Sequence, residues 1–335
     1  VFYLDLTSED GTQLERREFG MLNTQKKDLR FALCSCMDDA RHEPEIWQDL
    51  VERRPDMIFF IGDSVYVDYK DKHVPKNNPF RLWKRFSEAR RTLEIYYSKR
   101  LIPIFATWDD HDFGKDNSNS ESYPHVKLSQ KNFLSYFAQE ESHCSTLERG
   151  PGVSSAFKAG KHLFLLMDDR SYRLDDGNED RYAHWGQEQE EWALDVIGKH
   201  SGVTWLMNGS QIFPQMIYKE SMSGGHRNQF IGFMKSIRHL NKKVIFASGD
   251  VHFSEISKIE SEQLGYPTFE VTSSSMHSRC FPGLQHIALN RRRIVSTTKR
   301  NYILVDSSAN DQHSIANVYS CSAGEKVNFS RQLKV

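Results

Sequence analysis

Residues 101–117, LIPIFATWDDHDFGKDN, join an apolar run of strand length to a dense cluster of acids. The run over 101–107 is rich in β-forming side chains, and three aspartates then surround His111. Such a cluster repels itself unless a cation or water lies among the carboxylates. Because α/β proteins place their chemistry where strands leave the sheet, this stretch predicts an α/β fold with a charged site at a strand end.

The same succession of strand and helix patterns continues on both sides of this stretch. Expected strands cover residues 29–35, 57–61, 101–107, parts of 153–169, 203–207 and 243–248. Expected helices cover residues 43–54, 80–99, 186–199 and 226–240, and short strands dominate from 251 to 333. This alternation predicts parallel strands covered by helices, in one α/β domain over 29–335 that is built on two sheets.

The composition argues against several classes of protein. Lysine and arginine (44) nearly balance aspartate and glutamate (45), so the positive excess typical of nucleic-acid binders and membrane-surface binders is missing. No apolar run approaches the roughly 20 residues of a transmembrane helix. The five cysteines are odd in number and not densely spaced, which is not typical of a disulfide framework. We therefore expect no specific nucleic-acid binding and no transmembrane segment.

Three expected strands deliver a carboxylate to the end of a sheet. Asp63, Asp110 and Asp250 each follow one of them, and His252 comes two residues after Asp250. A single aspartate at such a place is usually a cap, whereas three in one chain, two of them with a nearby histidine, indicate a metal site. Converging carboxylates raise one another's pKa, and a pair of divalent or trivalent cations removes that repulsion.

Two cysteines end the first expected strand. For Cys34 the favoured interpretation is a small buried apolar side chain. Cys36 is the last of the run and lies beside the expected site, so we predict that it is a metal ligand.

The segments around these residues follow one another in a specific order. They are residues 35–36 (SC), 62–66 (GDSVY), 108–112 (WDDHD), 166–173 (LMDDRSYR), 205–211 (WLMNGSQ) and 248–252 (SGDVH). In this order they resemble the PhoD family of alkaline phosphatases, within the calcineurin-like metallophosphatase superfamily, and residues 272–277 (TSSSMH) resemble a further block of that family. The resemblance implies an αββα sandwich of two mixed sheets flanked by helices.

The resemblance also implies a binuclear metal centre. The implied ligands of a ferric ion are Cys36, Asp63, Tyr66 and His252. Those of a second ion, which is calcium in the family, are Asp63, Asp110 and Asp250. Thiolate, phenolate and carboxylate donors together favour a trivalent cation, and an oxygen-rich site suits calcium. Magnesium, manganese and zinc are the alternatives.

Four further residues are implied around the substrate. His111 would hydrogen-bond a phosphate oxygen or protonate the leaving group, and Asp112 would orient it, with a capping role as the alternative for Asp112. Arg170 and His277 would bind the substrate, since a guanidinium matches two phosphate oxygens at once. The alternative for Arg170 is a structural salt bridge with the aspartates that precede it.

These features predict a metal-dependent hydrolase of phosphate esters that acts on diesters as well as monoesters. Two metal ions would polarise a phosphoryl oxygen and hold the attacking hydroxide, so no covalent protein intermediate is needed. The alternatives are a metal-stabilised binding or adhesion module without turnover, and a hydrolase of a different bond. The roles of Gln211 and of the pair Asp116-Asn117 stay open, as does the natural substrate.

The N-terminal residues differ in pattern from the rest. Residues 1–20 alternate apolar and polar side chains around a turn and predict a β-hairpin. The resemblance implies that 1–23 are the tail of an N-terminal β-sandwich domain, most of which we expect to be absent. It also implies an exported monomer, periplasmic, extracellular or at the cell surface, that acts on small phosphate esters or on polymers and lipids containing phosphodiesters.

Overall fold

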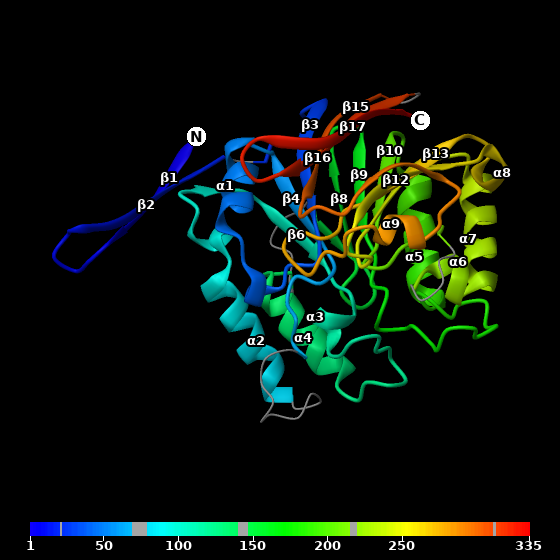
Figure 1. The fold of residues 1–335 in the computed structure, drawn as a ribbon, viewed down its shortest axis with the longest axis horizontal. Coiled ribbons are helices and arrows are strands. Elements are labelled where there is room, and N and C mark those ends of the chain that lie inside the picture. Colours follow the sequence, from blue (N-terminus) through cyan, green and yellow to red (C-terminus); the bar gives the residue numbers. More distant parts are fainter. Residues whose placement is uncertain (21, 69–78, 140–146, 215–219, 311–312) are drawn as a thin grey trace.

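Two sheets packed face to face form the body of the protein, and helices cover their outer faces (Figure 1). The computed structural model describes residues 1–20, 22–68, 79–139, 147–214, 220–310 and 313–335. The arrangement is the αββα sandwich with two mixed sheets that we predicted from the sequence.

The first sheet contains six strands in the order β17-β16-β15-β3-β4-β6. Their bounds are β3 Asp28–Cys34, β4 Met57–Ile61, β6 Ile104–Thr107, β15 Tyr302–Ala309, β16 Ser314–Ser322 and β17 Lys326–Lys334. Neighbours among β3, β4 and β6 are parallel, whereas β15 joins β3 in the antiparallel direction. The parallel half therefore brings the ends of β3, β4 and β6 to one edge of the sheet.

The second sheet contains eight strands in the order β14-β12-β13-β11-β10-β9-β8-β7. Their bounds are β7 Leu147–Arg149, β8 Ser155–Ala159, β9 His162–Leu166, β10 Val203–Met207, β11 Lys243–Ser248, β12 Ser254–Ile259, β13 Thr268–Thr272 and β14 Arg293–Thr297. The four central strands β9, β10, β11 and β13 are parallel.

Strand β4 shows why the central strands are apolar throughout. Met57, Phe59 and Ile61 belong to the core between the two sheets. Ile58 and Phe60 point the other way, into the core beneath the helices. Because both faces of the strand are buried, every position carries an apolar side chain, and the alternation of a half-exposed strand is missing.

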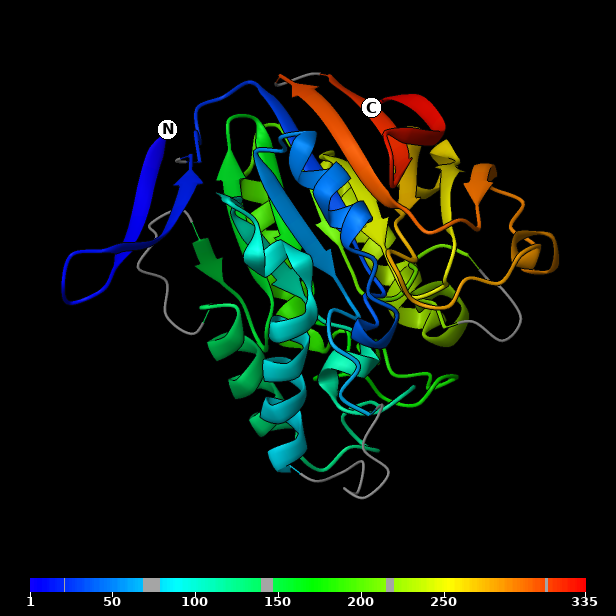
Figure 2. The same cartoon turned by 60° about the vertical axis from the view of Figure 1, so that its left-hand side comes forward.

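Helices cover each sheet from outside (Figure 2). The six-stranded sheet packs against α1 Pro44–Glu52, α2 Pro79–Thr92 and α4 Val126–Tyr136. The eight-stranded sheet packs against α5 Gln187–Lys199 and α7 Arg227–Leu240. Short helices are η1 Asp39–Arg41, η2 Glu94–Tyr97, α3 Asp110–Phe113, α6 Met222–Gly225, α8 Ser261–Leu264 and α9 Leu284–Ile287. Within the described ranges, no helix combines the length and hydropathy needed to cross a membrane.

Two boundaries differ from the sequence-based expectation. The strand expected over 101–107 is split, because Pro103 separates β6 from a short strand β5, Arg100–Leu101, which pairs with the N-terminal hairpin. A proline lacks the amide hydrogen that a continuous strand needs. The helix expected over 80–99 ends at Thr92 and is followed by η2.

The N-terminal hairpin consists of β1 Phe2–Thr7 and β2 Gln13–Phe19, which pair as expected and project from the body (Figures 1 and 2). Its contacts with the body include the pairing of β2 with β5 and a hydrogen bond from Arg17 to the carbonyl of Tyr96. The assignment of residues 1–23 to an N-terminal β domain stays a prediction.

Candidate metal centre

The candidate ligands lie on loops that leave the two sheets at strand ends. Cys36 follows β3, Asp63 follows β4, Asp110 follows β6, and Asp250 and His252 follow β11. All of these loops start at the carboxyl ends of parallel strands, where α/β folds gather their functional side chains. Chain topology therefore brings residues together that are more than 200 positions apart.

One group of donors surrounds the end of β3. A donor atom of Cys36, one of Asp63 and one of His252 lie within 4.8 Å of one another. The thiol of Cys36 is 3.6 Å from Asp63 Oδ2, and the Tyr66 hydroxyl donates to the same oxygen at 3.2 Å. The hydroxyl of Ser274 lies 3.0 Å from the Cys36 thiol and accepts from the backbone amide of His252. All four residues predicted for the ferric ion thus gather at this point.

A second group shares one member with the first. Donor atoms of Asp63, Asp110 and His111 also lie within 4.8 Å of one another. Asp250 is close enough to raise the pKa of both Cys36 and Asp63 by charge repulsion. Asp63 is therefore the residue common to both groups.

The charges in this site fit a bound cation. Burial, followed by repulsion from Asp110 and Asp109, raises the pKa of Asp63 well above its usual range. Burial and the Asp63 charge likewise raise the pKa of the Cys36 thiol. Asp63 Oδ1 is buried and makes no hydrogen bond to any residue that the structure describes. A cation would stabilise the ionised forms of both side chains and give this oxygen a partner.

The backbone supports the same interpretation. Cys36, Asp63, Asp250 and His252 all have left-handed conformations, with φ of 57°, 54°, 67° and 61°. Such a conformation costs a non-glycine residue about 1 kcal/mol or more, and strained residues concentrate at functional sites. Four of the candidate ligands are thus held in backbone geometries that only the surrounding fold maintains.

His111 lies beside this cluster and has two kinds of neighbour. Its Nδ1 is 2.8 Å from Asp68 Oδ1, and its ring packs against Tyr66 with the centroids 4.2 Å apart. Its Nε2 lies on the side of Asp116, 3.7 Å from the carboxylate. Burial would lower the pKa of His111, but the charges of Asp110 and Asp68 outweigh it and raise the pKa to about 9.

The structure corrects the expected partner of His111. We expected Asp112 to orient the imidazole, and Asp68 makes that contact instead. The Asp112 carboxylate accepts from the backbone amides of Ser64 and Val65 and from that of Asp109, at 3.2, 2.8 and 3.2 Å. Asp112 therefore caps α3 and ties the loop after β4 to the loop after β6, which was the alternative interpretation.

Comparison with known proteins identifies the family of the chain. The model of the PhoD-like phosphatase family matches residues 31–318. The chain belongs to the PhoD-like phosphatase family. It is accordingly a hydrolase of phosphoric esters, as predicted, and the candidate ligand groups agree with the metal dependence expected of it.

The fold agrees with that of a PhoD protein. A solved structure of PhoD superposes with a TM-score of 0.73 at 17% sequence identity, covering 98% of this chain and 73% of that one. A conserved Streptococcus pneumoniae protein, described as a predicted phosphoesterase, and Vps29 of Entamoeba histolytica reach TM-scores of only 0.34 and 0.32, at 9% and 10% identity. They cover 92% of this chain each, and 99% and 98% of their own. The search of curated proteins found no match.

The contacts of Arg170 are those of an internal ion pair. The side chain is 1% exposed and binds Asp109 and Glu220, and it also donates to the carbonyl of Ser118. The expected neighbour Asp169 is 3.8 Å away. These contacts favour the structural interpretation, and a phosphate-binding role for Arg170 in this PhoD-like phosphatase stays a prediction.

His277 is fully buried behind the metal site. Its Nδ1 lies 3.0 Å from the carbonyl of Asp38, and its ring packs edge-on against His42 and Trp47. Burial lowers the pKa of His277 to about 3, so the ring is neutral at physiological pH. Its predicted contact with substrate stays a prediction that these neighbours do not support.

The residues left open by the sequence have clear contacts. Asp116 and Asn117 use their backbone amides, which donate to Asp68 Oδ2 at 3.1 Å and to Asp110 Oδ2 at 2.6 Å. Gln211 donates through Nε2 to Glu255 at 3.1 Å and also to Thr272. Its Oε1 is buried without a hydrogen-bond partner among the described residues.

Sequence reasoning missed the residues that support the ligands. Asp109 was visible as an acid inside the motif 108–112, and Asp68 lies two residues after the motif 62–66, yet neither was assigned a role. Ser274 carried no signal beyond its place in the block 272–277. The contacts of all three depend on how the loops fold back on one another, which residue spacing does not specify.

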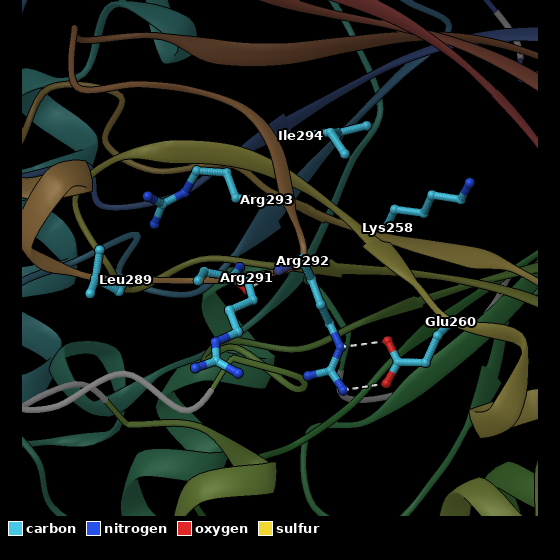
Figure 3. Close-up of a pocket in the computed structure, with 8 residues that line it drawn as sticks. Lys258, Glu260, Leu289, Arg291, Arg292, Arg293 and Ile294 are labelled. Carbon is cyan, nitrogen blue, oxygen red and sulfur yellow. Dashed lines mark hydrogen bonds and ion pairs between the residues drawn. The ribbon is translucent and has the colours of Figure 1, made fainter.

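A separate cavity of about 870 Å³ lies along β12 and β14 (Figure 3). It is lined by Lys258, Glu260, Leu289, Asn290, Arg291, Arg292, Arg293 and Ile294. Arg292 pairs with Glu260 across it, as the dashed lines in Figure 3 show. None of its lining residues is a candidate metal ligand, so this cavity is distinct from the site described above.

Proposed function

We propose that this PhoD-like phosphatase hydrolyses phosphodiesters as well as phosphomonoesters at a centre of two metal ions. The observation that carries the proposal is the sharing of Asp63 between two groups of donors. A carboxylate has two oxygens and can therefore neutralise two cations at once, whereas a single-metal site needs no such second group.

From these groups we propose two ligand sets, in which Asp250 takes the place of His111 in the second set, and the two sets suit different cations. Three anionic donors and one imidazole, from Cys36, Asp63, Tyr66 and His252, favour a trivalent ion, and we propose iron. The all-oxygen set of Asp63, Asp110 and Asp250 favours a hard divalent ion, and we propose calcium. Magnesium, manganese and zinc are the alternatives.

The residues of the chain have separate tasks in this proposal. Bound cations would supply polarisation of a phosphoryl oxygen and a lowered pKa of bound water. His111, held through Nδ1 by Asp68, presents Nε2 as a donor to a phosphate oxygen or to the departing alcohol. The Asp68 carboxylate at Nδ1 favours the protonated imidazole, which is the form that can donate this proton.

The substrate class and the location are part of the proposal. We assign small phosphate esters, or polymers and lipids containing phosphodiesters, as substrates of an exported monomer. Residues 1–23 are proposed to be the tail of an N-terminal β domain.

The decisive experiment replaces the shared carboxylate. Asp63→Asn keeps the shape of the side chain but removes its charge, so it should bind less than half as much of each metal and lose turnover of both ester types. Asp195→Asn is the matched control, because Asp195 is exposed on α5 and pairs with Lys199. Metal content by elemental analysis is measured beside hydrolysis of a phosphomonoester and a phosphodiester.

Unchanged content of both metals in Asp63→Asn would refute the shared-ligand assignment. A parent protein that binds metal but hydrolyses neither ester would instead support a binding module without turnover.

A further inference from the structure

The segment of residues 278–290, which follows the block 272–277, brings an aromatic ring to the metal site. Phe281 lies beside His252, with the two rings nearly parallel at 7° and their centroids 6.2 Å apart. The guanidinium of Arg279 lies over the Phe281 ring at 4.9 Å. Phe281 is 41% exposed, so part of its ring faces solvent beside the half-buried His252.

A partly buried ion pair and apolar contacts of Leu284 and Ala288 attach this segment to the sheet. Arg293 binds the carboxylate of Glu255, which is fully buried, and donates to the carbonyls of Gln285 and Ala288. Asn290 donates to the same carboxylate at 2.8 Å. The segment that carries Phe281 therefore has a defined position relative to β12, the strand that begins just after His252.

The position of the ring has a consequence for substrate binding. A phosphate held by the ligand cluster must direct its organic group away from the buried carboxylates and toward the exposed side. His252 and Asp250 are the half-buried ligands, so this side is the one on which Phe281 lies. An apolar group that covers the exposed part of the ring removes apolar surface of both partners from water.

We propose that Phe281 forms the wall of the substrate site that contacts the organic group of the ester, and that it makes the enzyme select esters with an aromatic group over small alkyl esters. The proposal rests on the proposed function, because it requires the reacting phosphate to bind beside His252. Arg293 is the positioning residue, since it holds the segment without touching the substrate.

The test compares benzyl phosphate with ethyl phosphate. Both release an unactivated primary alcohol, so the chemical step is similar and the substrates differ in the phenyl ring. In Phe281→Ala, the ratio of kcat/KM for benzyl over ethyl phosphate should fall about 5- to 20-fold. The decrease in kcat/KM should come from a higher KM for benzyl phosphate, because the contact between Phe281 and the phenyl group is equally strong in the ground state and the transition state.

Two variants serve as controls for the ring. Phe281→Tyr keeps the aromatic face and should keep the ratio within about twofold of the parent. Phe2→Ala removes a phenyl ring of similar exposure, 50%, from the N-terminal hairpin, and it should leave the ratio unchanged.

The positioning role is tested with Arg293→Lys. Lysine keeps a positive charge for Glu255 but cannot match the fork of a guanidinium that binds a carboxylate and two carbonyls together. The KM for benzyl phosphate should rise while kcat and KM for ethyl phosphate stay constant. A variant that lowers turnover of both esters equally would show a general structural role and would refute the positioning assignment.

Two outcomes overturn the proposal for Phe281. One is an unchanged benzyl-to-ethyl ratio in a folded Phe281→Ala protein with parental metal content. The other is a loss of metal in that variant, which would show that the ring supports His252 and not the substrate. Neither outcome touches the shared-ligand assignment, which the metal content of Asp63→Asn tests separately.

Discussion

His111 can be separated from the metal ligands by its contacts. It lies within reach of Asp63 and Asp110, yet its Nδ1 is already engaged by Asp68. We expect His111→Ala to retain both metals and the fold while turnover falls by about 10²- to 10⁴-fold, the usual effect of losing a general acid or base. Elemental analysis beside steady-state kinetics tests this, and a loss of metal would make His111 a ligand.

Tyr66 and Cys36 offer a spectroscopic test of metal identity. Phenolate and thiolate donate electron density to ferric iron and give it a visible absorption band, whereas zinc and calcium give none. We expect protein of known iron content to be coloured, and Tyr66→Phe or Cys36→Ser to shift or weaken the band. A band that neither substitution changes would show that neither residue binds the iron.

The candidate ligands were predictable because each follows a strand in a recognisable motif. Asp63, Asp110 and Asp250 directly continue buried strands, and topology then brings them together. Asp68 was not predictable in the same way. It lies five residues after Asp63, but its contact with His111 depends on the turn after β4 folding back over α3, and no spacing rule specifies that turn.

The carboxylates of Asp109 and Asp112 cap the short helix α3, and Asp112 makes the larger set of backbone contacts. Asp112 accepts from three backbone amides and is fully buried, so its removal leaves those donors without this partner. Asp112→Ala should lower the free energy of unfolding by about 2–4 kcal/mol.

Chemical denaturation measures this effect, with Asp195→Ala as the exposed control. A large loss of turnover at unchanged stability would contradict the capping role and restore Asp112 to catalysis.

The strand bounds expected from the sequence agree with the structure where both faces of the strand are buried. Residues 57–61, 203–207 and 243–248 were expected as strands, and the structure has β4, β10 and β11 at the same positions. The expectation over 101–107 was wrong in one respect, since Pro103 divides the apolar run. The apolar pattern indicates which residues are buried. The point at which this strand is interrupted depends instead on one proline that lacks a backbone amide hydrogen.

The two sheets are joined by more than apolar contacts. His162 of β9 reaches across to β15, where its Nε2 lies 2.9 Å from the Ser307 hydroxyl. Burial lowers the pKa of His162 to about 4. The unfolded chain therefore binds a proton on His162 more readily than the folded chain does. The stability that neutral His162 contributes to the fold is complete above about pH 6.5 and is lost as the pH falls toward 4.

We therefore expect the parent to lose about 2–3 kcal/mol more stability than His162→Gln between pH 7 and pH 4. Unfolding free energies from denaturant titrations at several pH values test this expectation. Parallel pH profiles for the two proteins would contradict it.

The pairing of β3 with β15 was beyond prediction. Residues 28–33 pair with 303–308, and the side chains alone give no indication that these distant segments are neighbours. The resemblance to a family supplied the sandwich architecture, while local patterns supplied only its elements. Long-range strand order depends on packing of the complete chain, which a single sequence does not display.

The left-handed backbone conformations of four candidate metal ligands lower the stability of the fold, whereas the metal centre that they form is needed for activity. In the absence of metal, Asp250→Gly would relieve an unfavourable backbone conformation and remove a half-buried charge from the acidic cluster, so the metal-free variant should melt at a higher temperature than the metal-free parent. Selection for heat resistance alone would thus favour loss of the centre. Any programme that evolves this enzyme for durability must therefore screen for hydrolysis in the same round, because its most stable descendants are expected to be inactive.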